Sequence, residues 1–130
     1  MPYEAEILMD QIKIIKKPIN KKELHDIIKT QGSDLVKAVI DIEHEIMAIG
    51  GELHADEEVL LMEQGTKREH TWGINLYPEK GGDDWIEFDS MINIKPSFGN
   101  RSRGVDDVVI KEKIKRVVRK LIHEPNNNHT

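Results

Sequence analysis

Two neighbouring segments in the second half of the chain alternate apolar and polar residues, and this period of two constrains the fold most. The first, residues 71–77, ends at Pro78, and the second, residues 84–94, follows a turn-rich connection. Such alternation is typical of antiparallel strands with one buried and one open face. The two segments therefore predict a hairpin. Its open, mostly polar face is expected to carry Gly73, Asn75, Tyr77, Trp85, Glu87, Asp89, Met91 and Asn93.

The rest of the chain predicts another hairpin and several helices. Helices are indicated where apolar residues recur every three to four positions and where capping residues flank the run. In chain order the expected elements are a short edge strand at residues 12–15, a helix from Asn20 to Gly32, hairpin strands at 35–42 and 46–49, a short helix at 55–64, and a long helix from Asp106 or Asp107 onwards. A strand is the alternative for residues 55–64.

This order predicts an α+β fold. We expect a two-layer sandwich, in which two to three helices cover one face of a mainly antiparallel sheet of four to five strands. Residues 12–124 are expected to form a single domain, preceded by a flexible leader at residues 1–11 and followed by a disordered tail at residues 125–130.

Charge and cysteine content exclude several classes of function. The 130 residues contain no cysteine, which excludes disulfides, thiolate nucleophiles and zinc sites with cysteine ligands. The net charge of -5 argues against general binding of nucleic acids, which relies on an excess of basic residues. No apolar run approaches the ~18 residues of a membrane span, and we expect a cytoplasmic protein with no membrane partner. The sequence leaves a homo-oligomer open.

A basic loop precedes the long C-terminal helix and predicts an anion site. Two glycines flank four residues with hydrogen-bonding side chains, Asn100, Arg101, Ser102 and Arg103. Arginine forks, accessible backbone amides and a helix start are the groups that bind phosphates and carboxylates. The loop lacks the pattern of a nucleotide-binding P-loop. In the alternative interpretation, the two arginines neutralise acidic residues of neighbouring strands.

The polar face of the predicted sheet supplies the other candidate contacts. Its expected ligand-binding residues are Asn75, Tyr77, Glu87, Asp89 and Asn93. Carboxylates with an imidazole also suit a divalent cation, and the metal-ligand candidates are Glu52, His54 and Asp89. The alternative is a solvated sheet face whose charges pair across strands.

Three segments carry a resemblance to a known family: Gly51–Glu58, Trp72–Glu79 and Asp84–Gly104. In these segments the chain resembles a family of small, uncharacterised bacterial proteins classed as a domain of unknown function. The similarity spans residues 12 to 122 and implies a single cytoplasmic prokaryotic domain. It brings no catalytic residue with it.

Three functions compete at this point. The leading hypothesis is a domain that binds an anionic ligand, a phosphorylated metabolite or nucleotide among them, through the basic loop. The first alternative is a metal-dependent phosphoester hydrolase or nuclease, in which a divalent cation is the cofactor and the arginines stabilise transition-state charge. The second is a regulatory module that contacts another protein. The sequence leaves open whether the protein is an enzyme.

Overall fold

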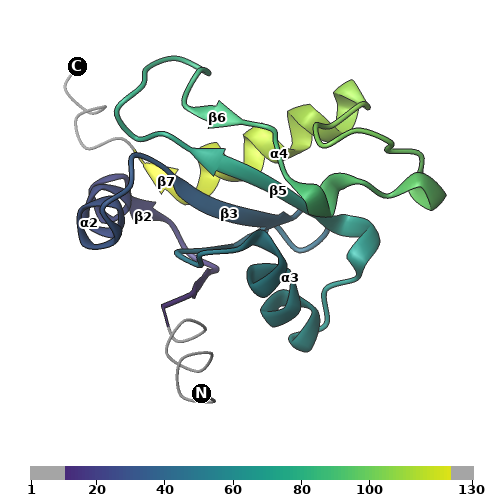
Figure 1. Cartoon of the computed structure of the whole chain (residues 1–130), viewed down its shortest axis with the longest axis horizontal. Coiled ribbons are helices and arrows are strands. Elements are labelled where there is room, and N and C mark those ends of the chain that lie inside the picture. Colours follow the sequence, from purple (N-terminus) through teal and green to yellow (C-terminus); the bar gives the residue numbers. More distant parts are fainter. Residues whose placement is uncertain (1–10, 124–130) are drawn as a thin grey trace.

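A computed structural model of the chain describes residues 11–123 (Figure 1). The expected tail, and the expected leader apart from Gln11, lie outside the described residues.

Five strands form one antiparallel sheet, which confirms the predicted α+β class. Both expected strands of the first hairpin are present and pair with each other. The expected edge strand is also present, and it forms one edge of the sheet. In spatial order the strands are β1 (Lys13–Ile15), β4 (Ile46–Ile49), β3 (Val36–Asp41), β5 (Thr71–Leu76) and β6 (Ile86–Glu87).

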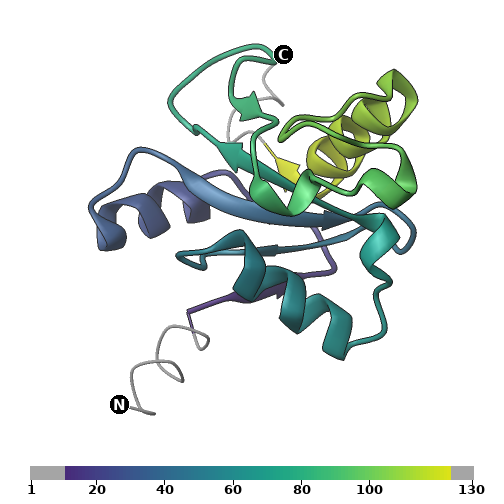
Figure 2. The same cartoon turned by 45° about the vertical axis from the view of Figure 1, so that its right-hand side comes forward.

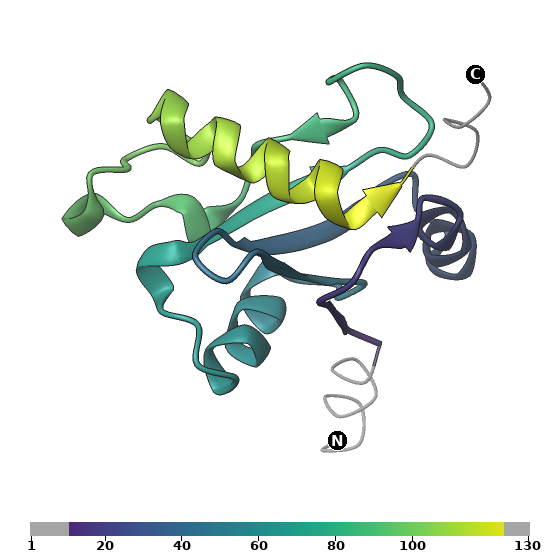
Figure 3. The same ribbon diagram turned by 180° about the vertical axis from the view of Figure 1, so that it is seen from behind.

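Helices cover both faces of this sheet (Figures 2 and 3). Helices α2 (Lys22–Gln31) and α4 (Val108–Leu121) pack on the first face, where alternate residues of β3 and β5 form the main core. Helix α3 (His54–Glu63) instead packs on the second face. The expectation that all helices share one face therefore does not hold for α3. The smaller core beneath it consists of Val39, Ala48, Leu61 and Ile92.

Local sequence signals explain where these helices begin and end. The Asn20 side chain accepts a hydrogen bond from the backbone N–H of Lys22 at 2.8 Å, and Gly32 ends α2 with a φ of 65°. Asp107 caps α4 by accepting a hydrogen bond from the backbone N–H of Val109 at 2.8 Å. No helix within residues 11–123 is both long and apolar enough to cross a membrane.

A two-stranded parallel ladder joins the two ends of the described chain. Strand β2 (Ile19–Asn20) precedes α2, and β7 (Ile122–His123) follows α4. The backbone N–H of Lys21 donates to the carbonyl of His123 at 2.8 Å and extends this contact. The ladder holds α2 and α4 together on the first face.

The prediction of a strand over residues 84–94 is wrong for most of this segment, because pairing with β5 ends after Glu87. A 3₁₀ turn, η2 (Met91–Asn93), replaces the expected strand. The Asn93 side chain accepts from the backbone N–H of Gly73 at 2.8 Å and donates to the Gly73 carbonyl at 3.0 Å. One side-chain amide thus satisfies the groups of β5 that a continuing strand would have paired. Two further 3₁₀ turns are η1 (Arg68–His70) and η3 (Pro96–Phe98).

Candidate functional site

A row of three polar residues crosses the second face of the sheet at the end that α3 leaves uncovered. Lys37 of β3 lies opposite Asn75 of β5, and Asn75 lies opposite Glu87 of β6. Side chains in such register point to the same face and lie next to one another. The Asn75 amide donates to the Glu87 carboxylate at 2.9 Å. The sequence correctly assigned Asn75 and Glu87 to one face.

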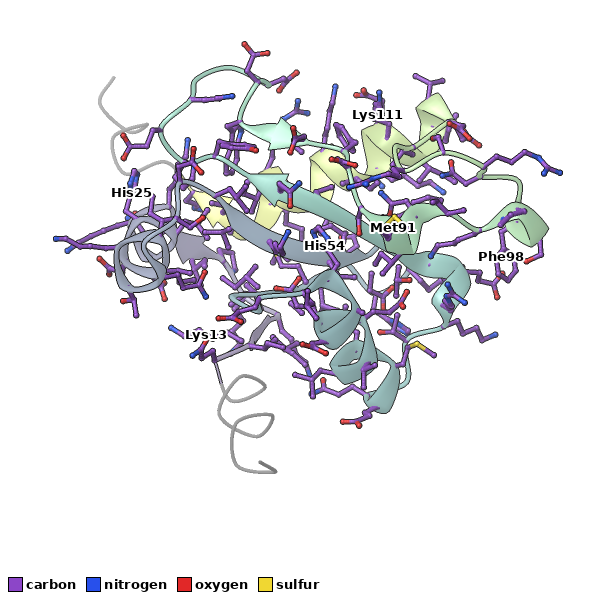
Figure 4. All side chains as sticks on the ribbon, viewed as in Figure 1. Lys13, His25, His54, Met91, Phe98 and Lys111 are labelled. Carbon is purple, nitrogen blue, oxygen red and sulfur yellow. The ribbon has the colours of Figure 1, made fainter. Side chains whose placement is uncertain are left out.

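A hollow of about 280 Å³ lies beside this row, between the start of α3 and the segment that follows β6. Figure 4 labels two of its wall residues, His54 and Met91, which lie near one another in this view. Its size is at the lower limit for small-molecule sites in proteins. The wall consists of Lys37, Leu53, His54, Ala55, Asn75, Asp89, Ser90, Met91, Ile92 and Arg103.

Asn75, which lines the hollow, has a buried acceptor without a partner among the described residues. The side chain is only 6% exposed, and its Oδ1 has no hydrogen-bond partner among the described residues. Its Nδ2 donates to the Glu87 carboxylate at 2.9 Å and to the backbone carbonyl of Asp89 at 3.3 Å. Because both partners are acceptors, a flipped amide would turn its oxygen toward oxygen, so the orientation is fixed. A buried acceptor without a donor costs about 1–3 kcal/mol.

His54, the first residue of α3, presents a second acceptor. Its Nε2 lies 2.8 Å from the backbone carbonyl of Ile74, so Nε2 carries the proton and donates it. Burial lowers the pKa of His54 from 6.5 to about 4, and the positive charges of Lys37 and Arg103 act in the same direction. The ring is therefore neutral at pH 7. Its Nδ1 retains a lone pair and has no hydrogen bond to the described part of the chain.

Gly73 allows His54 and Ser90 to lie directly on strand β5. A Cβ atom at Gly73 would lie 3.2 Å from Cγ of His54 and 2.6 Å from Cβ of Ser90. The second distance is far below van der Waals contact, so any larger residue would displace one wall of the hollow. The glycine in the alternating segment is thus explained by close packing.

Two cations make the hollow suitable for an anion. Lys37 is half-buried and forms no hydrogen bond or ion pair with residues 11–123. Arg103 donates from Nε to Oδ1 of Asp89 at 2.7 Å. In addition, no side chain caps the start of α3 at Leu53, so the positive end of the helix dipole faces the hollow. With one carboxylate against two cations, the wall has an excess of positive charge.

Glu57 of α3 is also buried, and its carboxyl group bonds to the backbone rather than lining the hollow. Its Oε2 accepts from the backbone N–H of Gly51 at 2.9 Å, and its Oε1 has no partner within residues 11–123. Complete burial raises the pKa of Glu57 well above its usual range. The residue therefore lies under the turn that leads from β4 into α3 and bonds to its backbone.

In the basic loop, which is the predicted anion site, a carboxylate of the same chain already binds two of the donors. Asp106 accepts from the backbone N–H of Arg101 at 3.0 Å and from the Ser102 hydroxyl at 2.6 Å. The buried Asn100 side chain donates to the backbone carbonyls of Asn93, Ser102 and Gly104 and accepts from the backbone N–H of Asp106, so its role is structural. Arg103 is the loop residue whose side chain lines the hollow.

The other predicted site residues do not all lie at the hollow. Asn93 is fully buried and is occupied by the backbone of β5. The Tyr77 hydroxyl donates to Glu87 at 3.2 Å, at the margin of the polar row. For the metal hypothesis, His54 and Asp89 line the same hollow, whereas Glu52 lines an adjacent one. The described residues include no group of three His, Cys, Asp or Glu that could hold a metal ion.

Of the ten residues in the wall of the hollow, the sequence predicted four as site residues and missed six, Ser90 among them. Lys37 carried a usable signal, since it interrupts the predominantly apolar strand Val36–Asp41 on the side that faces away from the main core. The missing apolar wall residues had no such signal, because their positions depend on how α3 and η2 dock. They are Leu53, Ala55, Met91 and Ile92.

Residues 13–121 match the model of a family described as "Protein of unknown function (DUF5674)". No curated protein and no solved structure matches the chain.

Proposed function

Because the chain belongs to the DUF5674 family, whose description names no activity, we propose a function from the hollow: the protein binds a small molecule that carries an anionic group. The ligand would lie over the Lys37–Asn75 pair, with the start of α3 on one side and Arg103 on the other. This proposal keeps the anionic ligand expected from the sequence and moves it from the basic loop to the hollow.

One observation carries the proposal. The Oδ1 of Asn75 is buried, has a fixed orientation and lacks a donor among the described residues, and the Asn75 residue lines an accessible hollow. Buried polar atoms are paired in the great majority of cases. A ligand that donates a hydrogen bond to Asn75 would remove this cost and would use the amide as a fixed recognition group.

The charges around Asn75 support an anion as the remainder of the ligand. Lys37 lies directly opposite in register and has no acceptor among residues 11–123. An ammonium group in a half-buried setting binds a carboxylate or phosphate more strongly than it does in open water. The uncapped start of α3 adds backbone donors on the same side of the hollow.

Calorimetry with a panel of small carboxylates and phosphates tests the proposal. At least one compound should bind, and Lys37→Met should weaken that binding at least tenfold, because it removes the unpaired charge and keeps most of the aliphatic stem. Lys113→Met is the matched control, since Lys113 is exposed on α4, away from the hollow, and should leave binding unchanged. Equal affinity in both variants, or no binding by any anion, would refute the proposal.

Thermal unfolding provides an independent readout. A ligand at 100 times its dissociation constant should stabilise the fold by about 2.7 kcal/mol. The stabilisation should weaken with added salt if an ion pair with Lys37 contributes. The proposed location of this activity is the cytoplasm, which rests on the sequence expectation alone.

A further inference from the structure

The positions of the unpaired groups restrict the chemistry of the ligand, provided that the proposed binding function holds. Lys37 and Asn75 are register partners on adjacent strands, so their Cβ atoms are about 5 Å apart. The anionic group that meets Lys37 and the donor that meets Asn75 must therefore be close neighbours within one ligand. A molecule with its charge and its donor at opposite ends does not fit this arrangement.

The donor must be an O–H or N–H group, because both unpaired protein atoms are acceptors. Oδ1 of Asn75 is the first acceptor, and Nδ1 of the neutral His54 is the second. Neither atom has a donor among the described residues. A hydroxyl satisfies one of these acceptors, and an ammonium group, which has three donors, satisfies both.

The rim of the hollow requires an apolar part on the same ligand. Leu53 is 58% exposed and Met91 is 64% exposed, and both line the hollow, as does the methyl group of Ala55. A short alkyl chain placed between them would remove this apolar surface from water. The volume of about 280 Å³ equals roughly nine water molecules at about 30 Å³ each. This space suits a molecule the size of a single amino acid.

We infer that the hollow binds a small carboxylic acid with a hydroxyl or amino group on the carbon next to the carboxylate and a short alkyl side chain. The carboxylate meets Lys37 and the backbone donors at the start of α3. The neighbouring O–H or N–H donates to Asn75, and the alkyl group lies between Leu53 and Met91. A monoanionic carboxylate also matches the single excess positive charge that Lys37, Arg103 and Asp89 leave in the wall.

Calorimetry with four matched compounds tests this inference on the intact chain. They are 2-hydroxy-4-methylpentanoate, leucine, 4-methylpentanoate, which lacks the donor, and leucinol, which lacks the carboxylate. One or both of the first two should bind at least tenfold tighter than 4-methylpentanoate, because the plain acid leaves Asn75 unpaired. Leucinol should not bind measurably.

Two variants locate the effect. Asn75→Ala should reduce the preference for the donor-bearing acid over 4-methylpentanoate to less than about twofold, whereas Lys113→Met, at an exposed position on α4, should preserve it. In the unmodified protein, NMR titration should show that the bound carboxylate raises the pKa of His54, since a negative charge nearby favours the imidazolium. The ligand comparison in the unmodified protein decides the inference even if Asn75→Ala does not fold.

The outcomes separate this inference from the proposed function. If inorganic phosphate or 4-methylpentanoate binds as tightly as the hydroxy and amino acids, the ligand class is wrong and anion binding stands. If a preference exists but survives Asn75→Ala in a folded variant, the assigned contact is wrong. If no anion binds at all, both proposals fail.

Discussion

Both ends of the second sheet face carry buried polar side chains, but the two ends differ in whether the polar atoms have hydrogen-bond partners. At the end near the 41–46 turn, polar side chains are buried and saturated with hydrogen bonds. At the other end, around the hollow, buried polar atoms lack partners among the described residues. The first arrangement stabilises the fold without a ligand. The second arrangement is complete only when another molecule contributes donors and charge, which distinguishes a structural polar cluster from a binding site.

The saturated end is built around Asp41 and Lys95. The Asp41 carboxylate accepts from the Thr66 hydroxyl at 2.6 Å, from Nδ1 of His44 at 2.7 Å and from two backbone N–H groups. Burial alone would raise its pKa, but these hydrogen bonds hold it below the usual value. Lys95 donates to the backbone carbonyls of Arg68 and Thr71. Burial lowers the pKa of Lys95 to about 8, so the side chain is still charged at pH 7.

The largest expected effect on stability comes from removing the Asp41 carboxylate at the saturated end. Asp41→Ala should reduce the free energy of unfolding by about 3–5 kcal/mol, because four donors lose their acceptor in a buried site. Urea unfolding followed by circular dichroism measures this change. Asp34→Ala, at an exposed position, is the control and should cost less than about 0.5 kcal/mol. A similar small cost for Asp41→Ala would remove the distinction between the two ends.

The second prediction concerns pH and the hollow. The pKa of His54 is about 4 in the folded protein and 6.5 as its ordinary value. Between these values the unfolded chain binds a proton that the folded protein does not bind. Stability should therefore be complete above pH 6.5 and should fall as the pH drops toward 4, by on the order of 3 kcal/mol. Urea unfolding across this range measures the loss, which should shrink in His54→Gln. An unchanged pH profile in that variant would contradict the assignment to His54.

The third prediction concerns the wall of the hollow. Gly73→Ala should destabilise the protein by about 1–3 kcal/mol, because the added methyl group overlaps Ser90 and crowds His54. Gly81→Ala is the matched control, since a Cβ there meets no atom within 4 Å. Two-dimensional NMR should show altered His54 ring signals in Gly73→Ala alone. Equal stability of the two variants would show that the close contact is not required.

The smallest expected effect on the free energy of unfolding is at Lys37. A small effect would support the distinction between a residue that stabilises the fold and one that binds a ligand. Lys37→Met should change the free energy of unfolding by less than about 1 kcal/mol, because no described residue loses a partner. The same variant should strongly impair ligand binding. A large loss of stability, measured by urea unfolding, would instead assign Lys37 to the fold rather than to a ligand.

The sequence predicted the regular elements well, because their signals are local. The alternation of Trp72, Ile74 and Leu76 fixed the buried side of β5, and Asp107 and Gly32 marked helix ends. The short helix after Gly51 was also expected. The face on which it packs was not, since that depends on which side of β3 the chain crosses after β4, and residue periodicity does not encode this choice.

The site was predicted only in part, for two physical reasons. Period-two reasoning found Asn75 and Glu87 but failed beyond Glu87, where the side chain of Asn93 replaces backbone pairing. The basic loop matched the composition of an anion site, but composition does not show that Asp106 binds those donors. Both failures involve a single side chain whose partner lies several residues or a whole strand away.

The short parallel ladder between β2 and β7 has a consequence for how the protein is made. It pairs Ile19 with Ile122, so Ile19 cannot acquire this neighbour until a residue about a hundred positions later in the chain has been made. Helix α4 also supplies Ile114, Val117, Val118 and Leu121 to the main core. A nascent chain from which these residues have not yet emerged therefore leaves the first sheet face uncovered, and this face can be completed only after residues 114–123 have left the ribosome.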